Sequence, residues 1–186
     1  MSRIDVGLLV IRLAIGLTLL VHACNHAFGR GGLAGTARWF ASLGMRRPRL
    51  QASLSAAVEA AAGAGVAAGF LTSAACAALV GVMIVAGWTA HRKNGFFVFR
   101  DGYEYVLVIA LTATALATAG PGRLSVDHVL DLDWRLSGWI GILIVAAIGV
   151  AGALAQMTAF WRPATPPGAV LDQPSVTAAR TQPDQD

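Results

Sequence analysis

The residues best suited to chemistry lie inside long apolar stretches of the chain. His22, Asn25 and His26 are three and four positions apart, so they share one face if this stretch is a helix. Glu59 lies in a second apolar stretch, and a carboxylate in such a setting usually faces the interior of a bundle. Histidine and carboxylate side chains exchange protons when their surroundings tune them. This set therefore predicts a site that exchanges protons or binds a small polar molecule.

A second group of polar residues lies in the segment from His91 to Tyr105, which reads HRKNGFFVFRDGYEY. His91 closes the apolar stretch before this segment, and Glu104 opens the stretch after it. By the helix rise, His22 lies roughly 9 Å and Glu59 roughly 12 Å below the membrane surface that carries the segment. We therefore expect four helices to bring polar groups to one surface. The candidate ligand-binding or proton-exchanging residues are His22, Asn25, His26, Glu59, His91, Tyr103 and Glu104.

Several of these charged residues also have a purely structural interpretation. Glu59 can pair with Arg12 or with a histidine and so fix helix packing. Glu104 can pair with Arg92 or Arg100 at the membrane surface. Arg12, inside the first apolar stretch, is expected to be a structural intramembrane charge that pairs or extends toward the nearer surface.

Motifs for other chemistries are weak or missing. His22 and His26 form a His-x-x-x-His pair, which can bind a metal with nearby carboxylates, but the repeated Glu-x-x-His motif of di-iron bundles is absent. We therefore expect no metal. No Ser-His-Asp set, Cys-x-x-Cys motif or phosphate-binding loop is evident. Cys24 and Cys76 are expected near opposite membrane surfaces and therefore unpaired. The residues alone identify no catalytic group and no cofactor.

The composition indicates a one-domain integral membrane protein. Of the 186 residues 56% are hydrophobic and 13% charged, and the mean hydropathy is +0.63. A soluble domain carries about 25% charged residues. The formal charge of +4 is the kind of excess that sets topology and meets anionic lipid. No basic patch interleaved with aromatic residues predicts nucleic-acid binding.

Five apolar stretches predict an all-α, polytopic membrane helix bundle. The 40 residues from Gln51 to Ala90 would form one helix roughly 60 Å long, whereas the hydrocarbon core is about 30 Å thick. They must therefore fold back between Gly69 and Ser73, where a glycine ends one helix and hydroxyl groups cap the next. The Ala- and Gly-rich helix before this break is expected to be the central, most buried one. The expected spans are 6–28, 52–71, 74–90, 103–119 and 137–161.

The loops carry a strong charge asymmetry. We call the membrane surface at the N-terminus the A side and the opposite surface the B side. The A side holds Arg3, Arg123 and Arg135, whereas the B side holds ten Lys and Arg residues. The positive-inside rule places the B side in the cytoplasm and the N-terminus outside. The first B-side loop, 29–50, is expected to contain a short interfacial helix near 36–43. Residues 162–186, with five prolines, are predicted to be a disordered cytoplasmic tail.

Several spaced motifs carry a family resemblance. They run in order from about Leu8 to Leu130: LLVIRLAIG around Arg12, LLVHACNHAFG, GLAGTARWFASLG, VEAAAGAGVAAGFLT with Glu59, NGFFVFRDGYEY and GPGRLSVDHVL. With these motifs the chain resembles the DoxX family of small bacterial membrane proteins. The resemblance implies a four-helix membrane core spanning much of residues 1–161, to which this chain adds a fifth helix and the tail. Many relatives carry Lys where this chain has His26, and a histidine there would titrate near neutral pH.

The resemblance also implies work in redox or sulfur stress at a bacterial cell (inner) membrane. The family is named after a subunit linked to thiosulfate:quinone oxidoreductase, and mycobacterial relatives are associated with a complex containing superoxide dismutase and a sulfurtransferase. The leading hypothesis is a membrane subunit of a quinone- or sulfur-linked oxidoreductase system, not catalytic alone, with a quinone as the candidate cofactor. The alternatives are an anchor or assembly factor for soluble redox enzymes at the cytoplasmic face and a small-molecule carrier. The carrier is less favoured because no inverted repeat is evident, although a homo-oligomer could supply a path.

Overall fold

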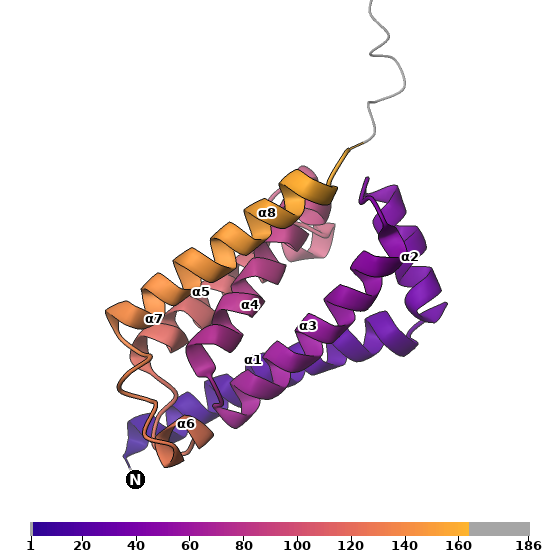
Figure 1. The fold of residues 1–186 in the computed structure, drawn as a ribbon. Helices are drawn as coiled ribbons and strands as arrows, with labels where there is room; N and C mark the ends of the chain where they lie inside the picture. Colours follow the sequence, from indigo (N-terminus) through magenta and orange to yellow (C-terminus); the bar gives the residue numbers. More distant parts are fainter. Residues whose placement is uncertain (1, 164–186) are drawn as a thin grey trace, which may run out of the picture.

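The computed structural model describes residues 2–163, which form a bundle of helices (Figure 1). A helix occupies each of the five predicted apolar stretches, and the all-α fold class is confirmed. The last stretch is continuous but contains a π-helical segment, η4. The tail predicted from residue 162 lies outside the described residues from 164 onward. The main elements are α1 (Arg3–Phe28), α2 (Gly32–Ser42), α3 (Pro48–Ala68), α4 (Thr72–Ala86), η1 (Gly87–His91), α5 (Glu104–Ala119), α6 (Val126–Val129), α7 (Trp139–Ile144), η4 (Val145–Val150) and α8 (Ala151–Phe160).

Three helical segments are long and apolar enough to cross a membrane: Arg3–Phe28, Thr72–Asn94 and Trp139–Phe160. α5 is also apolar but shorter. Most of the surface of these segments faces outward, as expected when lipid rather than protein covers apolar side chains. The bundle is therefore a helical membrane protein.

α1 and α3 pack backbone against backbone. A Cβ atom added to Gly16 would lie 2.7 Å from the carbonyl oxygen of Gly63, and one added to Gly63 would lie 2.8 Å from that of Gly16. Small residues permit such an approach, which gains dispersion energy in lipid, where helices gain no hydrophobic driving force. Any side chain at either glycine would push the two helices apart.

α4 occupies the centre of the bundle, which corrects the expectation that the preceding Ala- and Gly-rich helix would do so. α4 contacts α3, α5 and the α7–η4–α8 helix, and Cys76, Ala77 and Leu79 are fully buried. Gly149 of η4 lies against the backbone of Ala77, so the fifth helix packs on α4 within the same chain. The small residues of α3 serve its close contact with α1, whereas its other face, including Ala57, is exposed.

The turn between α3 and α4 confirms one expectation and corrects another. Gly69 ends α3 with a left-handed φ of 66°, as expected for a C-terminal glycine. The hydroxyl groups of Thr72 and Ser73, however, do not cap α4. Asp127 of α6 accepts hydrogen bonds from the backbone N–H groups of Leu71 (2.7 Å) and Thr72 (2.8 Å) and from the Thr72 hydroxyl (2.7 Å). The tight turn leaves these N–H groups unbonded within the helix, and a carboxylate distant in sequence is the acceptor that reaches them.

The loops gather at two ends of the bundle (Figure 1). At the A side, the carboxylate of Asp5 accepts a hydrogen bond from the backbone N–H of Arg123 (3.0 Å). At the B side, the backbone N–H of Arg46 donates to the carbonyl of Phe160 (2.7 Å), so the loop after α2 adjoins the end of α8. The expected short helix in the first B-side loop is present as α2, and it begins four residues earlier than expected.

Candidate functional site

A cleft of about 550 Å³ lies at the B side between the α1–α2–α3 group and the α4–α5 group. The two groups of helices diverge toward this side (Figure 1). A short turn at the A side joins α3 to α4. Among the described residues, no short connection joins these two helices at the B side. The side chains that line the cleft and carry polar groups are those of His22, Asn25, His26, Arg30, Thr36, Trp39, Glu59, His91, Asp101 and Tyr105.

Glu59 is the buried acid of the cleft, with 4% of its surface exposed. Its Oε1 accepts a hydrogen bond from the Ser55 hydroxyl one turn earlier on α3. The same oxygen lies 3.5 Å from Nε2 of His26. Of the two partners expected from the sequence, a histidine is therefore the one that meets Glu59, and Arg12 is engaged elsewhere. The pair therefore links α1 to α3 through two titratable side chains.

His26 is held in place by α2. Its ring stacks on Trp39, with ring centroids 6.2 Å apart, and meets Phe40 edge-on at 5.9 Å. The hydroxyl of Thr36 donates a hydrogen bond to the backbone carbonyl of His26 (2.9 Å), which ties α2 to the end of α1. The aromatic face of α2 thus covers the His26–Glu59 pair.

Tyr105 lines the cleft although the sequence-based set omitted it. Its ring lies 6.1 Å from that of His22, centroid to centroid, and it shares a helix face with Ile109, which also lines the cleft. Residues on a helix advance by about 100° per position, so the two residues just before Tyr105 point elsewhere. An apolar residue also lies four positions after Tyr103 and after Glu104, so the sequence held no signal that singled out Tyr105.

Tyr103 and Glu104 lie outside the lining of the cleft. The Tyr103 ring packs against Phe96, with centroids 5.5 Å apart. Glu104 accepts a hydrogen bond from the backbone N–H of Val98 (2.9 Å) and so shapes the loop before α5. Among the ion pairs of residues 2–163, none joins Glu104 to Arg92 or Arg100.

His91 borders the cleft through the loop that follows it. Its Nδ1 lies 2.9 Å from the backbone carbonyl oxygen of Asp101 and 3.4 Å from the Asp101 carboxylate. Asp101 adopts a left-handed φ of 60°, which turns the loop back toward the end of α4. Asp101 was not among the predicted site residues, and the Asp-Gly pair at 101–102, typical of a turn, was the signal for it.

Arg12 lies toward the A side, buried to 1% exposure. Its Nη2 donates a hydrogen bond to the backbone carbonyl of Leu124. A Cβ added to Gly69 would meet the guanidinium group and the side chain of Ser125. Arg12 therefore fills the space between the α3–α4 turn and the segment before α6.

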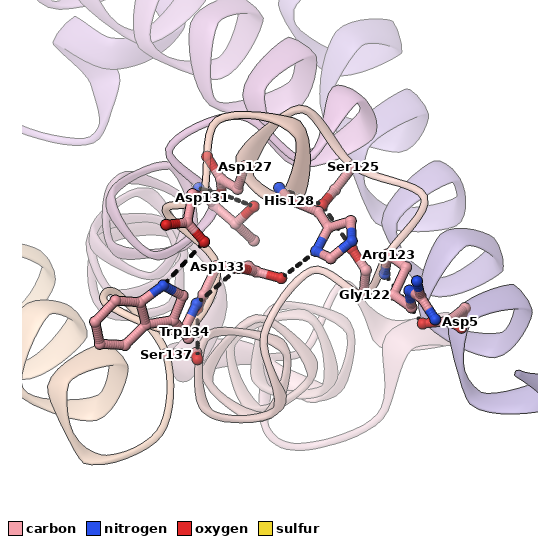
Figure 2. Close-up of polar contacts among 11 residues, drawn as sticks. Asp5, Gly122, Arg123, Ser125, Asp127, His128, Asp131, Asp133, Trp134 and Ser137 are labelled. Atoms are coloured by element: carbon pink, nitrogen blue, oxygen red, sulfur yellow. Dashed lines mark hydrogen bonds and ion pairs between the residues drawn. The ribbon is translucent and has the colours of Figure 1, made fainter. Parts of the chain in front are cut away.

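The A side holds a separate polar cluster (Figure 2). Nδ1 of His128 lies 2.6 Å from the carboxylate of Asp133, so this histidine is paired with an acid. The indole N–H of Trp134 donates to Asp131 (3.1 Å). Asp127 of α6, which bonds to the α3–α4 turn, holds the segment before α7 on the bundle, whereas the His128–Asp133 and Trp134–Asp131 contacts lie within that segment.

Metal-binding geometry is not found in the part of the chain that the structure describes. Within residues 2–163, His, Cys, Asp and Glu side chains form no group of three or more that could hold a metal ion. Cys24 is exposed and Cys76 is buried, and both are free.

The fold and cleft define a helical membrane protein with a polar site near one end of its bundle. The model of the DoxX family matches residues 7–92, which confirms the resemblance to that family. This range includes His22, His26, Glu59 and His91. An uncharacterized protein of Haemophilus influenzae (strain ATCC 51907 / DSM 11121 / KW20 / Rd) is 29% identical over 75 residues, which are 40% of this chain and 50% of that relative. The chain thus matches about half the length of this curated relative. No solved structure matches the chain.

Proposed function

We propose that this DoxX-like protein is a membrane subunit of a quinone- or sulfur-linked redox system, and that its B-side cleft binds a quinone headgroup. The observation that carries the proposal is the buried Glu59 beside His26, both facing a cleft of about 550 Å³. An ionisable side chain at membrane depth is costly and usually marks a functional path. The proposal places the protein in a bacterial inner membrane with the B side in the cytoplasm, because the positive charges lie at that side.

The chemistry follows from what a quinone needs. Its reduction to a quinol takes two electrons and two protons. Glu59 and His26 would deliver protons to the quinone oxygens in turn and be reprotonated from water at the B side. Asn25 and Tyr105, which also line the cleft, offer hydrogen-bond donors for the carbonyl oxygens. The electrons would come from a redox partner protein of the proposed system.

Native mass spectrometry of the protein in lipid nanodiscs tests this proposal. We expect the wild type to bind an added benzoquinone at one per chain. Glu59→Gln should weaken binding about tenfold, since it removes the acidic O–H that would donate to a quinone oxygen. Glu104→Gln is the matched control, because Glu104 lies outside the cleft, and it should bind like the wild type. Absence of binding to the wild type, or equal binding by Glu59→Gln, would contradict the proposal.

A second function, anchoring of soluble redox enzymes, is favoured by one observation. Arg30, Arg38, Arg46, Arg47 and Arg49 of the first B-side loop are all exposed. A surface with this charge attracts an acidic partner or anionic lipid.

Replacing Arg38, Arg46 and Arg49 together by glutamine separates the two functions. If anchoring is the function, this variant should lose the co-purifying redox enzymes that the wild type retains, whereas Glu59→Gln should keep them. Retention of the same enzymes by the triple variant would count against anchoring through this loop.

A further inference from the structure

A second cavity, of about 120 Å³, adjoins the cleft. It lies between α2–α3 and α4–α8 and shares three lining residues with the cleft: His26, Trp39 and Ala86. The imidazole of His26, which meets Glu59, therefore borders both spaces. A molecule seated in the cleft beside His26 is next to the second cavity.

The second cavity offers a ligand mostly apolar surface. Its aliphatic lining includes Val58, Val82 and Val85. Three of the polar side chains at its wall, those of Ser55, Thr89 and Gln156, already donate hydrogen bonds. The Thr89 hydroxyl donates to the carbonyl of Val85 (2.8 Å), and the Gln156 amide donates to Gln51 (2.8 Å). A polar ligand would thus find few partners there, whereas a hydrocarbon chain would lose no hydrogen bonds on entering.

The cavity also reaches the outer surface of the bundle. Leu54 lines it and is 45% exposed. Leu54 lies one turn before Val58, which also lines the cavity, so its exposed part marks an opening of the cavity beside α3. A chain longer than the cavity can therefore continue past Leu54 into the bilayer.

We infer that cleft and cavity form one bipartite site for an isoprenoid quinone, with the ring in the cleft and the first units of the chain in the cavity. This inference rests on the proposed function and deepens it, because it distinguishes a lipid-borne quinone from a tailless redox molecule. In lipid the chain gains no hydrophobic energy on binding, so the cavity acts through close packing, which fixes the direction of the ring toward Glu59 and His26.

Two photoreactive probes in nanodiscs test the inference. One is a tailless azidobenzoquinone, which reports the ring site, and the other is a benzoquinone with a diazirine on its first isoprenoid unit. We expect the tailless probe to label the cleft near His22 and Tyr105, and the tailed probe to label Val58, Val82 or Val85. A diazirine-bearing fatty acid is the comparison probe, and its labelling shows whether the cavity accepts any lipid chain.

Filling the cavity supplies the decisive variant. Val58→Phe should reduce labelling of Val82 and Val85 by the tailed probe about fivefold or more, through overpacking, and leave the tailless probe unchanged. Val108→Phe is the matched control, because Val108 is 56% exposed on α5 and lies outside both spaces. Val82→Leu, a smaller change, provides the same readout if Val58→Phe does not fold.

The outcomes separate the two proposals. Ring labelling in the cleft without tail labelling in the cavity overturns the bipartite site and leaves the headgroup proposal intact. Labelling by neither quinone probe overturns both. Labelling of the cavity by the fatty acid as strongly as by the tailed quinone assigns the cavity to a lipid chain and also overturns the inference.

Discussion

The A side and the B side of the bundle use polar side chains in opposite ways. At the A side, Asp127 is 2% exposed and accepts hydrogen bonds from backbone and hydroxyl donors of α4 and its turn. At the B side, Glu59 is nearly as buried, yet it faces a cleft and has one hydroxyl and one histidine beside it. A buried carboxylate whose oxygens all accept hydrogen bonds from the protein stabilises the fold. A buried carboxylate that faces a cleft is available to a ligand.

The connections at each side explain this difference. At the A side, the short turn after Gly69 holds α3 and α4 together, and the segment before α7 folds onto it through Asp127. At the B side, the loop before α3 and the loop before α5 connect other pairs of helices, so α3 and α4 separate (Figure 1). Space for a ligand therefore arises where no short connection joins the two helix groups.

The largest test of the comparison is Asp127→Ala. This change leaves two backbone N–H groups and a buried hydroxyl without their acceptor, so we expect a loss of about 3 kcal/mol in the free energy of unfolding. Thermal unfolding in nanodiscs, followed by circular dichroism, measures it. Asp131→Asn in the same segment is the control, because asparagine tolerates the left-handed φ of 55° at this position. Its carboxylate binds only an exposed indole N–H, so the loss should stay under about 1 kcal/mol. Equal losses of stability in the two variants would mean that the hydrogen bonds of Asp127 to the α3–α4 turn do not stabilise the A side.

A somewhat smaller loss is expected for Gly69→Ala. The left-handed φ of 66° disfavours alanine, and the added Cβ would collide with the guanidinium of Arg12. Together these effects should lower the free energy of unfolding by about 2 kcal/mol. Gly7→Ala, on the open face of α1 with nothing within 4 Å, is the matched control and should be neutral or slightly stabilising. A neutral Gly69→Ala would show that the turn tolerates rearrangement.

At the B side, Glu59→Gln should change stability by less than about 1 kcal/mol, because the amide oxygen still accepts from the Ser55 hydroxyl and no charge is left buried. The same variant should bind the quinone about tenfold more weakly than the wild type. The same unfolding assay, run alongside ligand binding, checks both. If Glu59→Gln destabilised the protein as much as Asp127→Ala, the contrast between the two sides would fail and Glu59 would be a packing residue.

The smallest effect is expected for Tyr103→Phe, which removes a hydroxyl outside the cleft. It should leave both stability and quinone binding at the wild-type level. Tyr105→Phe, two residues later, should weaken binding about threefold if the phenol donates to the quinone. Isothermal titration calorimetry with the same benzoquinone compares the binding affinities of the two variants. Weakening by Tyr103→Phe rather than Tyr105→Phe would mean that α5 is rotated from the orientation seen here.

Much of the candidate site was predictable because its pattern is local. His22, Asn25 and His26 share a helix face by spacing alone, and all three line the cleft together with Glu59 and His91. The choice among Tyr103, Glu104 and Tyr105 was not predictable in the same way. It depends on how α5 is rotated about its axis against α4 and α1, and apolar residues surround α5 almost evenly in sequence. Asp101 was missed because a backbone turn, rather than a periodic pattern, brings it to His91.

The sequence by itself determined the membrane class, the helical stretches, the break at Gly69 and the gathering of polar groups toward one end. Each follows from composition or from spacing within a single segment, where short-range geometry suffices. Only the tertiary structure decided that α4 is central, that Asp127 caps it, and that Glu59 meets His26 rather than Arg12. These outcomes depend on packing between helices that are distant in sequence. In lipid that packing is set by small differences in shape and by which buried polar groups find partners.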